Sequence, residues 1–419
     1  MRRLTDYLTT RGKSVLAAGI VMVLAGMALG VVDLSRIGVL CIALPVLAAL
    51  LTRHHDLGIT VERTVRPSRV PIDSVSTVDL AIANPGPRRT PLIMAEEHVD
   101  YALGDRPRFV VPSMRAGERR VLKYTVRSHT RGRHRIGPLA IRVRDPFGLS
   151  LRAAAHTGHT DVLVLPRVVP LTPARAKGSE LGAEGTIPHM VALHGEDDVS
   201  IREYRDGDDL RRIHWPATAR TGEIMVRQED RPATRRATVL LDSRASRHRG
   251  SGTSATFEWS VTAVASVICH LLDLGYAVHL LTPRADVDAR IHQNVDEEDA
   301  LDTLAEVTTT GDEALADVLR AASGVTASGG LVVAVVASMG DDDARALAAL
   351  RQPGSNGLAF VVRTGRGARS GSEEIDGAAE ATAAVLVGAG WSVLVVDAHA
   401  PLDEAWRRVS GGERQVVAG

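Results

Sequence analysis

The densest group of charged and aromatic residues lies at residues 201–222, around a glycine and a tryptophan. Asp208 and Asp209 precede His214 closely, and paired carboxylates beside a histidine suit general acid–base chemistry. The same carboxylates can instead form paired hydrogen bonds with neighbouring arginines. Three roles are therefore open for this segment: an internal salt-bridge latch, a surface for another protein, and catalysis.

We expect a latch or a protein-binding surface, because nothing in the sequence identifies a substrate and Arg, Tyr and Trp are frequent interface anchors. An aspartate after Gly207 is expected to cap a short helix that carries Leu210 and Ile213. Trp215 is expected to cover the ion pairs and exclude water from them. The residues assigned to the latch or partner surface are Arg202, Glu203, Tyr204, Gly207, Asp208, Asp209, Arg211, Trp215 and Arg220.

The composition excludes several classes of protein. The chain has 419 residues, of which 45% are hydrophobic, so it is long enough for two or three folded domains and is not wholly disordered. Fifty basic residues balance fifty acidic ones and aromatics are 3%, which argues against nucleic-acid binding. The two cysteines, Cys41 and Cys269, are far apart and predict no disulfide framework. No phosphate-binding Gly-x-x-x-x-Gly-Lys run occurs, so the chain is not itself a P-loop ATPase.

Two apolar stretches near the N-terminus predict a membrane hairpin. Residues 14–32 carry no charge and would form a helix of about 28 Å, close to the thickness of a bilayer core. A shorter uncharged stretch, residues 37–52, contains Pro45 and follows the presumed turn at residues 33–36. The alternative is a secretory signal peptide, but its apolar core would be unusually long and another apolar stretch follows at once.

Basic residues flank both apolar stretches and predict their orientation. By the positive-inside rule both ends of the hairpin face the cytoplasm, and so does the rest of the chain. We therefore expect a multi-pass protein of the cell membrane with its soluble domains in the cytoplasm. The basic residues on the two flanks are Arg2, Arg3, Arg11, Lys13, Arg53, Arg63, Arg66 and Arg69.

The remaining chain has two regions that differ in their hydrophobic pattern. Residues 58–165 contain short runs with period-two alternation between Pro and Gly turns, which predicts an antiparallel β-sandwich. From residue 237 onward, apolar strands without polar alternation are separated by helical stretches, which predicts a doubly wound α/β domain. The expected divisions are a cytoplasmic tail at 1–13, the transmembrane hairpin at 14–52, the sandwich at 58–165, a linker at 166–236 that contains the segment 201–222, the α/β domain at 237–411 and a tail at 412–419.

The run from Arg202 to Gly222 resembles the signature of the bacterial domain-of-unknown-function 58 family. Asp145-Pro146-Phe147-Gly148-Leu149, preceded by Arg131-Gly132 and Ile136-Gly137-Pro138-Leu139, resembles the preceding β region of that family. The resemblance covers essentially the whole chain and implies that the α/β domain is von Willebrand A-like. It also implies that the gene for this chain lies beside genes for MoxR-type AAA+ ATPases and transglutaminase-like membrane proteins. This association in turn implies a scaffold or adaptor for an ATPase with a chaperone-like role. It implies no biochemical activity.

The von Willebrand A resemblance also implies a candidate site for a divalent metal ion. Such domains often hold a divalent cation through Asp-x-Ser-x-Ser after the first strand, and oxygen ligands of this kind suit magnesium. Asp242 and Ser246 match that pattern, but Arg244 stands at the middle serine, and its charge could pair with Asp242 in the metal's place. Asp341 is a candidate for a further ligand. We expect no bound cofactor, and keep magnesium at Asp242 and Ser246 as the alternative.

The expected function is thus a membrane-anchored, non-catalytic adaptor that faces the cytoplasm and works with a MoxR-type AAA+ ATPase in a chaperone-like or envelope-related process. Two alternatives stay open: a metal-dependent ligand-binding domain using Asp242 and Ser246, and an enzyme using Asp208, Asp209 and His214.

Overall fold

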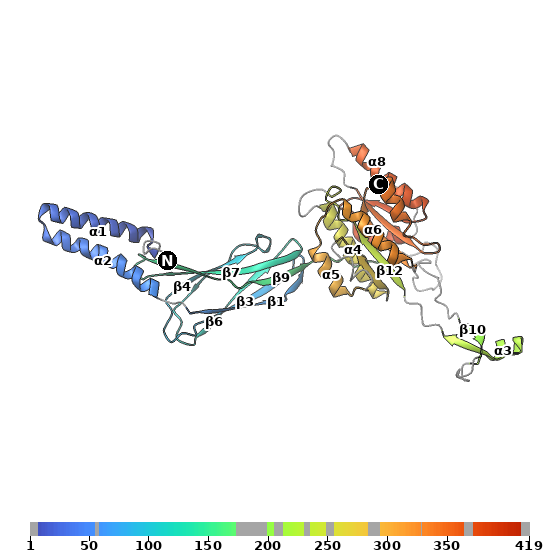
Figure 1. Ribbon diagram of the computed structural model, residues 1–419, viewed down its shortest axis with the longest axis horizontal. Helices are drawn as coiled ribbons and strands as arrows, with labels where there is room; N and C mark the ends of the chain where they lie inside the picture. Colours follow the sequence, from blue (N-terminus) through green and yellow to red (C-terminus); the bar gives the residue numbers. More distant parts are fainter. Residues whose placement is uncertain are drawn as a thin grey trace. The chain divides into compact units, whose positions relative to one another are not determined.

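A computed structural model describes residues 7–54, 58–172, 199–204, 213–229, 235–248, 255–283, 294–327, 329–363 and 372–411. The chain divides into two compact units, residues 1–165 and 166–419 (Figure 1).

Two apolar helices open the first unit and lie side by side (Figure 1). Both are long and apolar enough to cross a membrane, and the first would span about 30 Å. The predicted turn at residues 33–36 is wrong, because the chain reverses at Gly30, whose left-handed backbone ends the first helix, and residues 33–36 form the start of the second. The helices are α1 (Thr10–Leu29) and α2 (Val32–His54).

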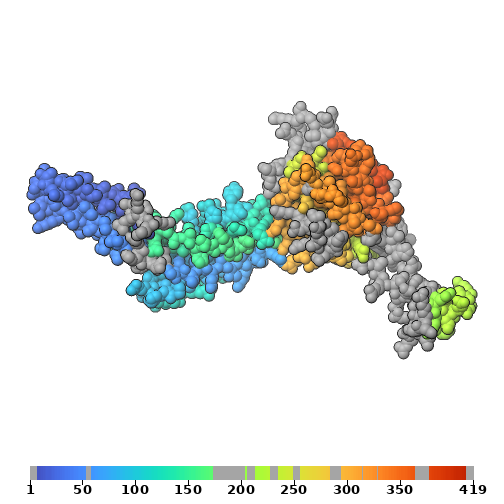
Figure 2. Space-filling view, in the orientation of Figure 1, coloured from blue at the N-terminus to red at the C-terminus, as the bar shows by residue number. Residues whose placement is uncertain are grey.

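Glycines let these two helices approach closely. A Cβ at Gly19 would lie 2.8 Å from the carbonyl oxygen of Gly38, and one at Gly38 would lie 2.7 Å from the backbone nitrogen of Val23. The outward surface of the pair is apolar and exposed, and Figure 2 shows it in dark blue. Its exposed large side chains are Ile20, Val21, Leu24, Met27, Leu29, Val31, Val32, Ile37, Val39, Leu40, Leu44, Leu47, Leu50 and Leu51.

Two sheets follow in the first unit, as the alternating sequence pattern predicts. A three-stranded sheet has the order β1-β3-β6, and a six-stranded sheet has the order β2-β9-β7-β4-β5 with β8 paired to β7. The pairs are antiparallel, except that β2 runs parallel to β9. The strands are β1 (Thr60–Arg66), β2 (Arg69–Pro71), β3 (Val75–Ala83), β4 (Ile93–Val99), β5 (Arg108–Val111), β6 (Arg119–Arg127), β7 (Gly132–Arg144), β8 (Leu151–His156) and β9 (Thr160–Leu165).

Apolar side chains from both sheets share two buried clusters. In one cluster Val78 of β3 packs with Ile136 of β7, and in the other Leu80 of β3 packs with Ile141 of β7. A buried ion pair also joins the sheets. Arg63 of β1 donates from Nη2 to Oε1 of Glu97 in β4 at 2.7 Å and from Nε to Oε2 at 3.3 Å, and both side chains are almost fully buried.

The second unit contains a parallel sheet of five strands in the order β13-β12-β14-β15-β16. In chain order this is second, first, third, fourth and fifth, which is one of the two common doubly wound orders. The predicted α/β region is therefore present. Its elements are β12 (Arg236–Leu241), α4 (Ala255–Asp273), β13 (Ala277–Leu281), α5 (Glu297–Glu306), α6 (Glu313–Thr326), β14 (Leu331–Ala337), α7 (Asp341–Ala348), β15 (Gly357–Val362), α8 (Ser372–Gly388), β16 (Ser392–Val396) and α9 (Leu402–Ser410).

Helices cover both faces of this sheet. Val333 of β14 packs in a cluster with α4, α5 and α9, whereas its neighbours Val332 and Ala334 pack in a second cluster with α6, α7 and α8. This two-sided burial explains why the strands read as continuous apolar runs. Helix α4 is also long and apolar enough to span a membrane, but it is mostly buried in the first of these clusters, so we treat it as a core helix.

A small separate motif precedes the parallel sheet. Strand β10 (Val199–Glu203) pairs antiparallel with β11 (Met225–Glu229), and the short helix α3 (Trp215–Thr221) lies between them in the sequence.

Candidate functional site

Asp242 directly follows β12, at the carboxyl end of the parallel sheet. Ligands of doubly wound sheets bind at this edge, where neighbouring connections leave in opposite directions, and β12 lies at that position between β13 and β14. The backbone nitrogen of Asp242 donates to the carbonyl of Val335, and Ala337 donates its backbone N–H to Oδ2 of Asp242 at 3.1 Å. These contacts fix the carboxylate at the end of two adjacent strands.

The guanidinium of Arg244 hydrogen-bonds to both oxygens of this carboxylate. Its Nη2 lies 2.7 Å from Oδ2 and its Nε 3.0 Å from Oδ1, and both side chains are buried. Burial alone would lower the pKa of Arg244, but hydrogen bonds and charge from Asp242, with the charges of Asp343 and Asp312, raise it. The pairing that the sequence suggested is therefore present and keeps Arg244 charged.

Further oxygen-bearing side chains surround this pair. Ser243 Oγ lies 2.8 Å from Thr310 Oγ1, and the hydroxyl of Ser246 donates to Asp312. The acidic residue of α7 nearest the pair is Asp343, 3.9 Å from Arg244 Nη1. Asp341, which the sequence singled out, is instead exposed and pairs with Arg345 of its own helix. No sequence motif marks Thr310, Asp312 or Asp343, so their place beside this pair is evident only from the fold.

The residues as arranged do not fit a divalent cation, because a cation at Asp242 would have to displace Arg244 from both carboxylate oxygens. Within the described ranges, no three His, Cys, Asp or Glu side chains gather in a way that could hold a metal ion. Two further hydroxyls lie close by in the sequence: that of Ser243 hydrogen-bonds to Thr310, and that of Ser246 to Asp312.

Replacing the guanidinium should therefore create a weak magnesium site. Arg244→Ser restores the Asp-x-Ser-x-Ser pattern and leaves the Asp242 carboxylate without its cation. We expect Mg²⁺ to raise the thermal midpoint of the Arg244→Ser chain and to leave the wild-type midpoint unchanged, measured by differential scanning fluorimetry in detergent. Equal Mg²⁺ responses in both chains would show that Arg244 does not exclude the ion.

A buried histidine, His248, hydrogen-bonds to the backbone of Asp242 at the same site. His248 Nε2 lies 3.0 Å from the backbone carbonyl oxygen of Asp242, to which it donates, and the ring is buried. Burial lowers the pKa of His248, although the charge and carbonyl of Asp242 oppose the shift. His270 in α4 also has its pKa lowered by burial.

These histidines predict a loss of stability in mild acid. As the pH falls below about 6.5, the unfolded chain takes up protons that the folded chain excludes, so the free energy of unfolding decreases by at most about 1.4 kcal/mol per pH unit and histidine. We expect His248→Gln, which retains a donor, to reduce this slope in urea titrations between pH 7 and pH 5. The exposed His399→Gln serves as the matched control and should leave the slope unchanged.

The second candidate site is the motif β10–α3–β11, which includes described parts of the segment 201–222. Helix α3 begins after His214, whose Nδ1 accepts from the backbone N–H of Ala217 at 3.2 Å, and ends at Gly222. The prediction that Ile213 lies on a capped helix is wrong, because Ile213 forms a β-bridge with Val226. Trp215 is 67% exposed, and the aspartates that it was expected to cover lie outside the described residues.

Trp215, Ile224 and Arg220 give this motif an exposed surface of interface character. Ile224 is 47% exposed, and Arg220 is exposed in the last turn of α3. Glu203 and Tyr204 are at the end of β10, where the backbone N–H of Tyr204 donates to the carbonyl of Ile224. The predicted residues Gly207, Asp208, Asp209 and Arg211, and the side chain of Arg202, lie outside what the structure describes.

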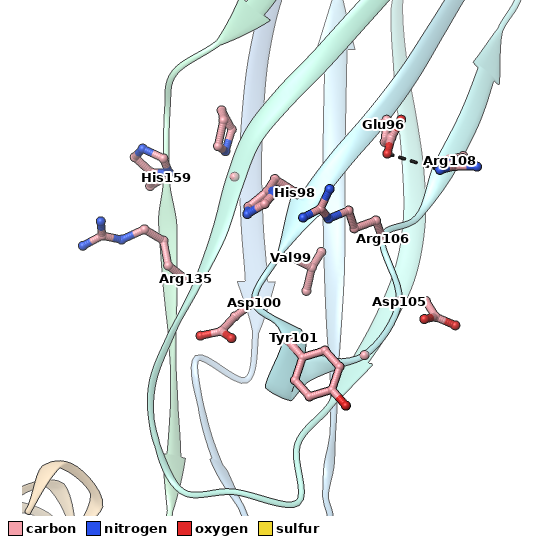
Figure 3. A pocket seen from close by; sticks show the side chains of 13 residues that line it. Glu96, His98, Val99, Asp100, Tyr101, Asp105, Arg106, Arg108, Arg135 and His159 are labelled. Atoms are coloured by element: carbon pink, nitrogen blue, oxygen red, sulfur yellow. Dashed lines mark hydrogen bonds and ion pairs between the residues drawn. The ribbon is translucent and has the colours of Figure 1, made fainter. Parts of the chain in front are cut away.

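An open groove of about 1020 Å³ lies at one end of the six-stranded sheet (Figure 3). Residues of both charges line it: Arg106 and Arg135 are basic, and Asp100 and Asp105 are acidic. Tyr101, in the short helix η2 (Tyr101–Leu103), is 96% exposed at its edge. This mixed lining selects no ligand class, and the sequence pattern did not indicate the groove.

Comparisons with known proteins identify one family. The family model described as "Protein of unknown function DUF58" matches residues 200–362, which include the whole segment 201–222 and the first four strands of the parallel sheet. No curated protein matches the chain.

Solved structures give only weak likenesses. The CARDB domain of a Pyrococcus furiosus protein, in complex with di-metal ions, is 20% identical over 26% of this chain and 87% of that chain, with a TM-score of 0.20. The alkylpurine DNA glycosylase AlkC of Pseudomonas fluorescens, bound to DNA, is 13% identical over 30% of this chain and 38% of that chain, with a TM-score of 0.17. Such low TM-scores do not indicate a shared overall fold.

Proposed function

Since the chain belongs, through residues 200–362, to the domain-of-unknown-function 58 family, we propose that it is a membrane-anchored, non-catalytic adaptor. The apolar hairpin α1–α2 anchors it in two passes. The sheets of the first unit form a β-sandwich that acts as a spacer, and the α/β region is a von Willebrand A-like domain whose metal position is taken by Arg244.

The exposed Trp215 is the observation that carries this proposal. A tryptophan with 67% of its surface in water, beside an exposed arginine and near an exposed isoleucine in the sequence, has the composition of a binding hot spot. A partner that covers this side chain would remove apolar surface from water, which favours binding.

Two contacts argue against an enzyme. His214 uses Nδ1 as an acceptor that caps α3, and this holds that nitrogen away from proton transfer. The carboxylate of Asp242 is fully engaged by Arg244 and by the backbone of Ala337. Proton transfer through Nδ1 of His214 or through the Asp242 carboxylate would require that atom to leave a partner that stabilises the fold.

The proposed orientation places both ends of the hairpin in the cytoplasm, because basic residues flank both helices. A C-terminal reporter that is active only outside the membrane would contradict it.

The proposed partner is a MoxR-type AAA+ ATPase, with a transglutaminase-like membrane protein in the same assembly. This follows from the family resemblance of the segment 201–222, and a cytoplasmic orientation would place the partner surface where a soluble ATPase can reach it. The process served is chaperone-like or envelope-related.

Co-purification tests this proposal. The tagged full-length chain, extracted from membranes in mild detergent, should bring down the ATPase, and Trp215→Ala and Asp208→Ala should each lose it. Tyr101→Ala is the matched control, because it removes an exposed aromatic side chain from the other unit. Retained co-purification by Trp215→Ala and Asp208→Ala, both still folded, would remove this surface from the interface.

A further inference from the structure

The turn between β7 and β8 accepts hydrogen bonds from Thr9, the residue that precedes helix α1. Thr9 donates its backbone N–H to the carbonyl of Leu149 at 2.9 Å and its hydroxyl to the carbonyl of Gly148 at 2.7 Å. A side chain at Gly12 would collide with the same Leu149 carbonyl, so glycine at this position lets α1 lie against the turn.

The same turn also hydrogen-bonds to the end of helix α2. Ser150 Oγ lies 2.6 Å from Thr52 Oγ1 and also contacts the carbonyl of Ala48 at 3.3 Å. Asp145 accepts from the Ser150 hydroxyl at 3.1 Å and thereby closes the turn on itself. Both ends of the hairpin are thus fastened to one six-residue loop, residues 145–150.

These contacts fix the height of the turn relative to the membrane. Gly12 and Ala48 both lie inside the helices that could span a membrane, Thr10–Leu29 and Val32–Thr52. A loop in contact with them lies beside the last helical turns, where the hydrocarbon core gives way to the headgroups. Phe147, at the tip of the loop, is 67% exposed although it is large and apolar.

We propose that residues 145–150 insert into the headgroup layer, with Phe147 as an interfacial anchor; this rests on the membrane span of the proposed function. Aromatic rings favour the membrane interface, because one layer holds both their apolar body and neighbouring polar groups. The exposed basic residues Arg11, Lys13 and Arg144, adjacent in sequence to the contacts above, supply charge complementary to lipid phosphates. The lipid surface thereby becomes a second support for the sheets, beyond the covalent link from α2.

Site-specific quenching in nanodiscs tests this proposal on the full chain. With Cys41 and Cys269 replaced by alanine, single cysteines introduced by Phe147→Cys, Tyr101→Cys or Val21→Cys carry an NBD label. The nanodiscs contain phosphatidylcholine and phosphatidylglycerol, with a nitroxide either on the headgroup or within the acyl chain. Tyr101 is the matched control, because the pairing of β4 with β7 places it about 30 Å from the turn, at the far end of that strand pair.

We expect the headgroup nitroxide to lower fluorescence at position 147 about twofold and to leave position 101 unchanged, because only the former lies in the interface. The acyl-chain nitroxide should quench position 21 most strongly. Quenching at 21 without quenching at 147 would overturn the anchor and leave the membrane span intact. Absence of quenching at 21 would overturn both the anchor and the span on which it rests.

Discussion

Asp242→Ala is expected to lower the free energy of unfolding of the α/β region by about 3–5 kcal/mol, because it leaves Arg244 charged and buried without its partner. Surrounding acids hold the charge on Arg244, so the side chain cannot escape the cost by losing its proton. Urea unfolding followed by tryptophan fluorescence measures the effect, since all four tryptophans lie after residue 166 and three of them are buried in this region.

Asp341→Ala is the matched control for this variant. Asp341 pairs with Arg345 at 3.3 Å, but both side chains are well exposed, so the expected loss is below about 1 kcal/mol. The double variant Asp242→Ala, Arg244→Ala should be less destabilised than Asp242→Ala alone, because the buried charge is gone. A loss below about 1 kcal/mol for Asp242→Ala would show that the pair is not buried in solution.

The other large effect is expected at the ion pair between the two sheets. Arg63→Ala should destabilise the first unit by about 3–5 kcal/mol, because Glu97 is fully buried and its carboxylate loses a bidentate partner. Burial raises the pKa of Glu97 even with Arg63 present, so the variant carboxyl is expected to bind a proton in the folded chain, and its destabilisation should ease in mild acid.

Hydrogen exchange measured by mass spectrometry suits this unit, which contains no tryptophan. Peptides from β1 and β4 should exchange faster in Arg63→Ala and keep wild-type rates in Arg119→Ala. Arg119 is the control, because its pair with Glu62, at 2.8 Å, also joins two strands but is exposed. Unchanged exchange in Arg63→Ala would mean that the pair contributes little to holding the sheets together.

The sequence predicted the elements of this protein better than the contacts between them. Continuous apolar runs such as Leu331–Ala337 identify strands buried on both faces, and the structure has a strand with these same bounds. The apolar hairpin was also predictable, since about 20 uncharged residues leave few alternatives. Its turn was misplaced because Gly30 reverses the chain before the first charge, Asp33, appears.

Long-range pairing explains what sequence reasoning missed. Thr310 and Asp343 meet the Asp242–Arg244 pair only because parallel strands bring distant loops to one edge of the sheet. The ion pair of Arg63 with Glu97 likewise joins strands of different sheets and has no local signal. The contacts of the turn 145–150 with both apolar helices span about a hundred residues or more of sequence, beyond the reach of any local pattern.

The affinity of the purified chain for the purified MoxR-type ATPase tests the adaptor role most directly. With the chain held in nanodiscs on a biolayer sensor, we predict saturable binding that Trp215→Ala weakens by at least about 30-fold, the effect of losing a hot spot worth about 2 kcal/mol. Tyr101→Ala should bind like the wild type. Equal affinities for wild type and Trp215→Ala, or no binding by the wild type, would contradict the account.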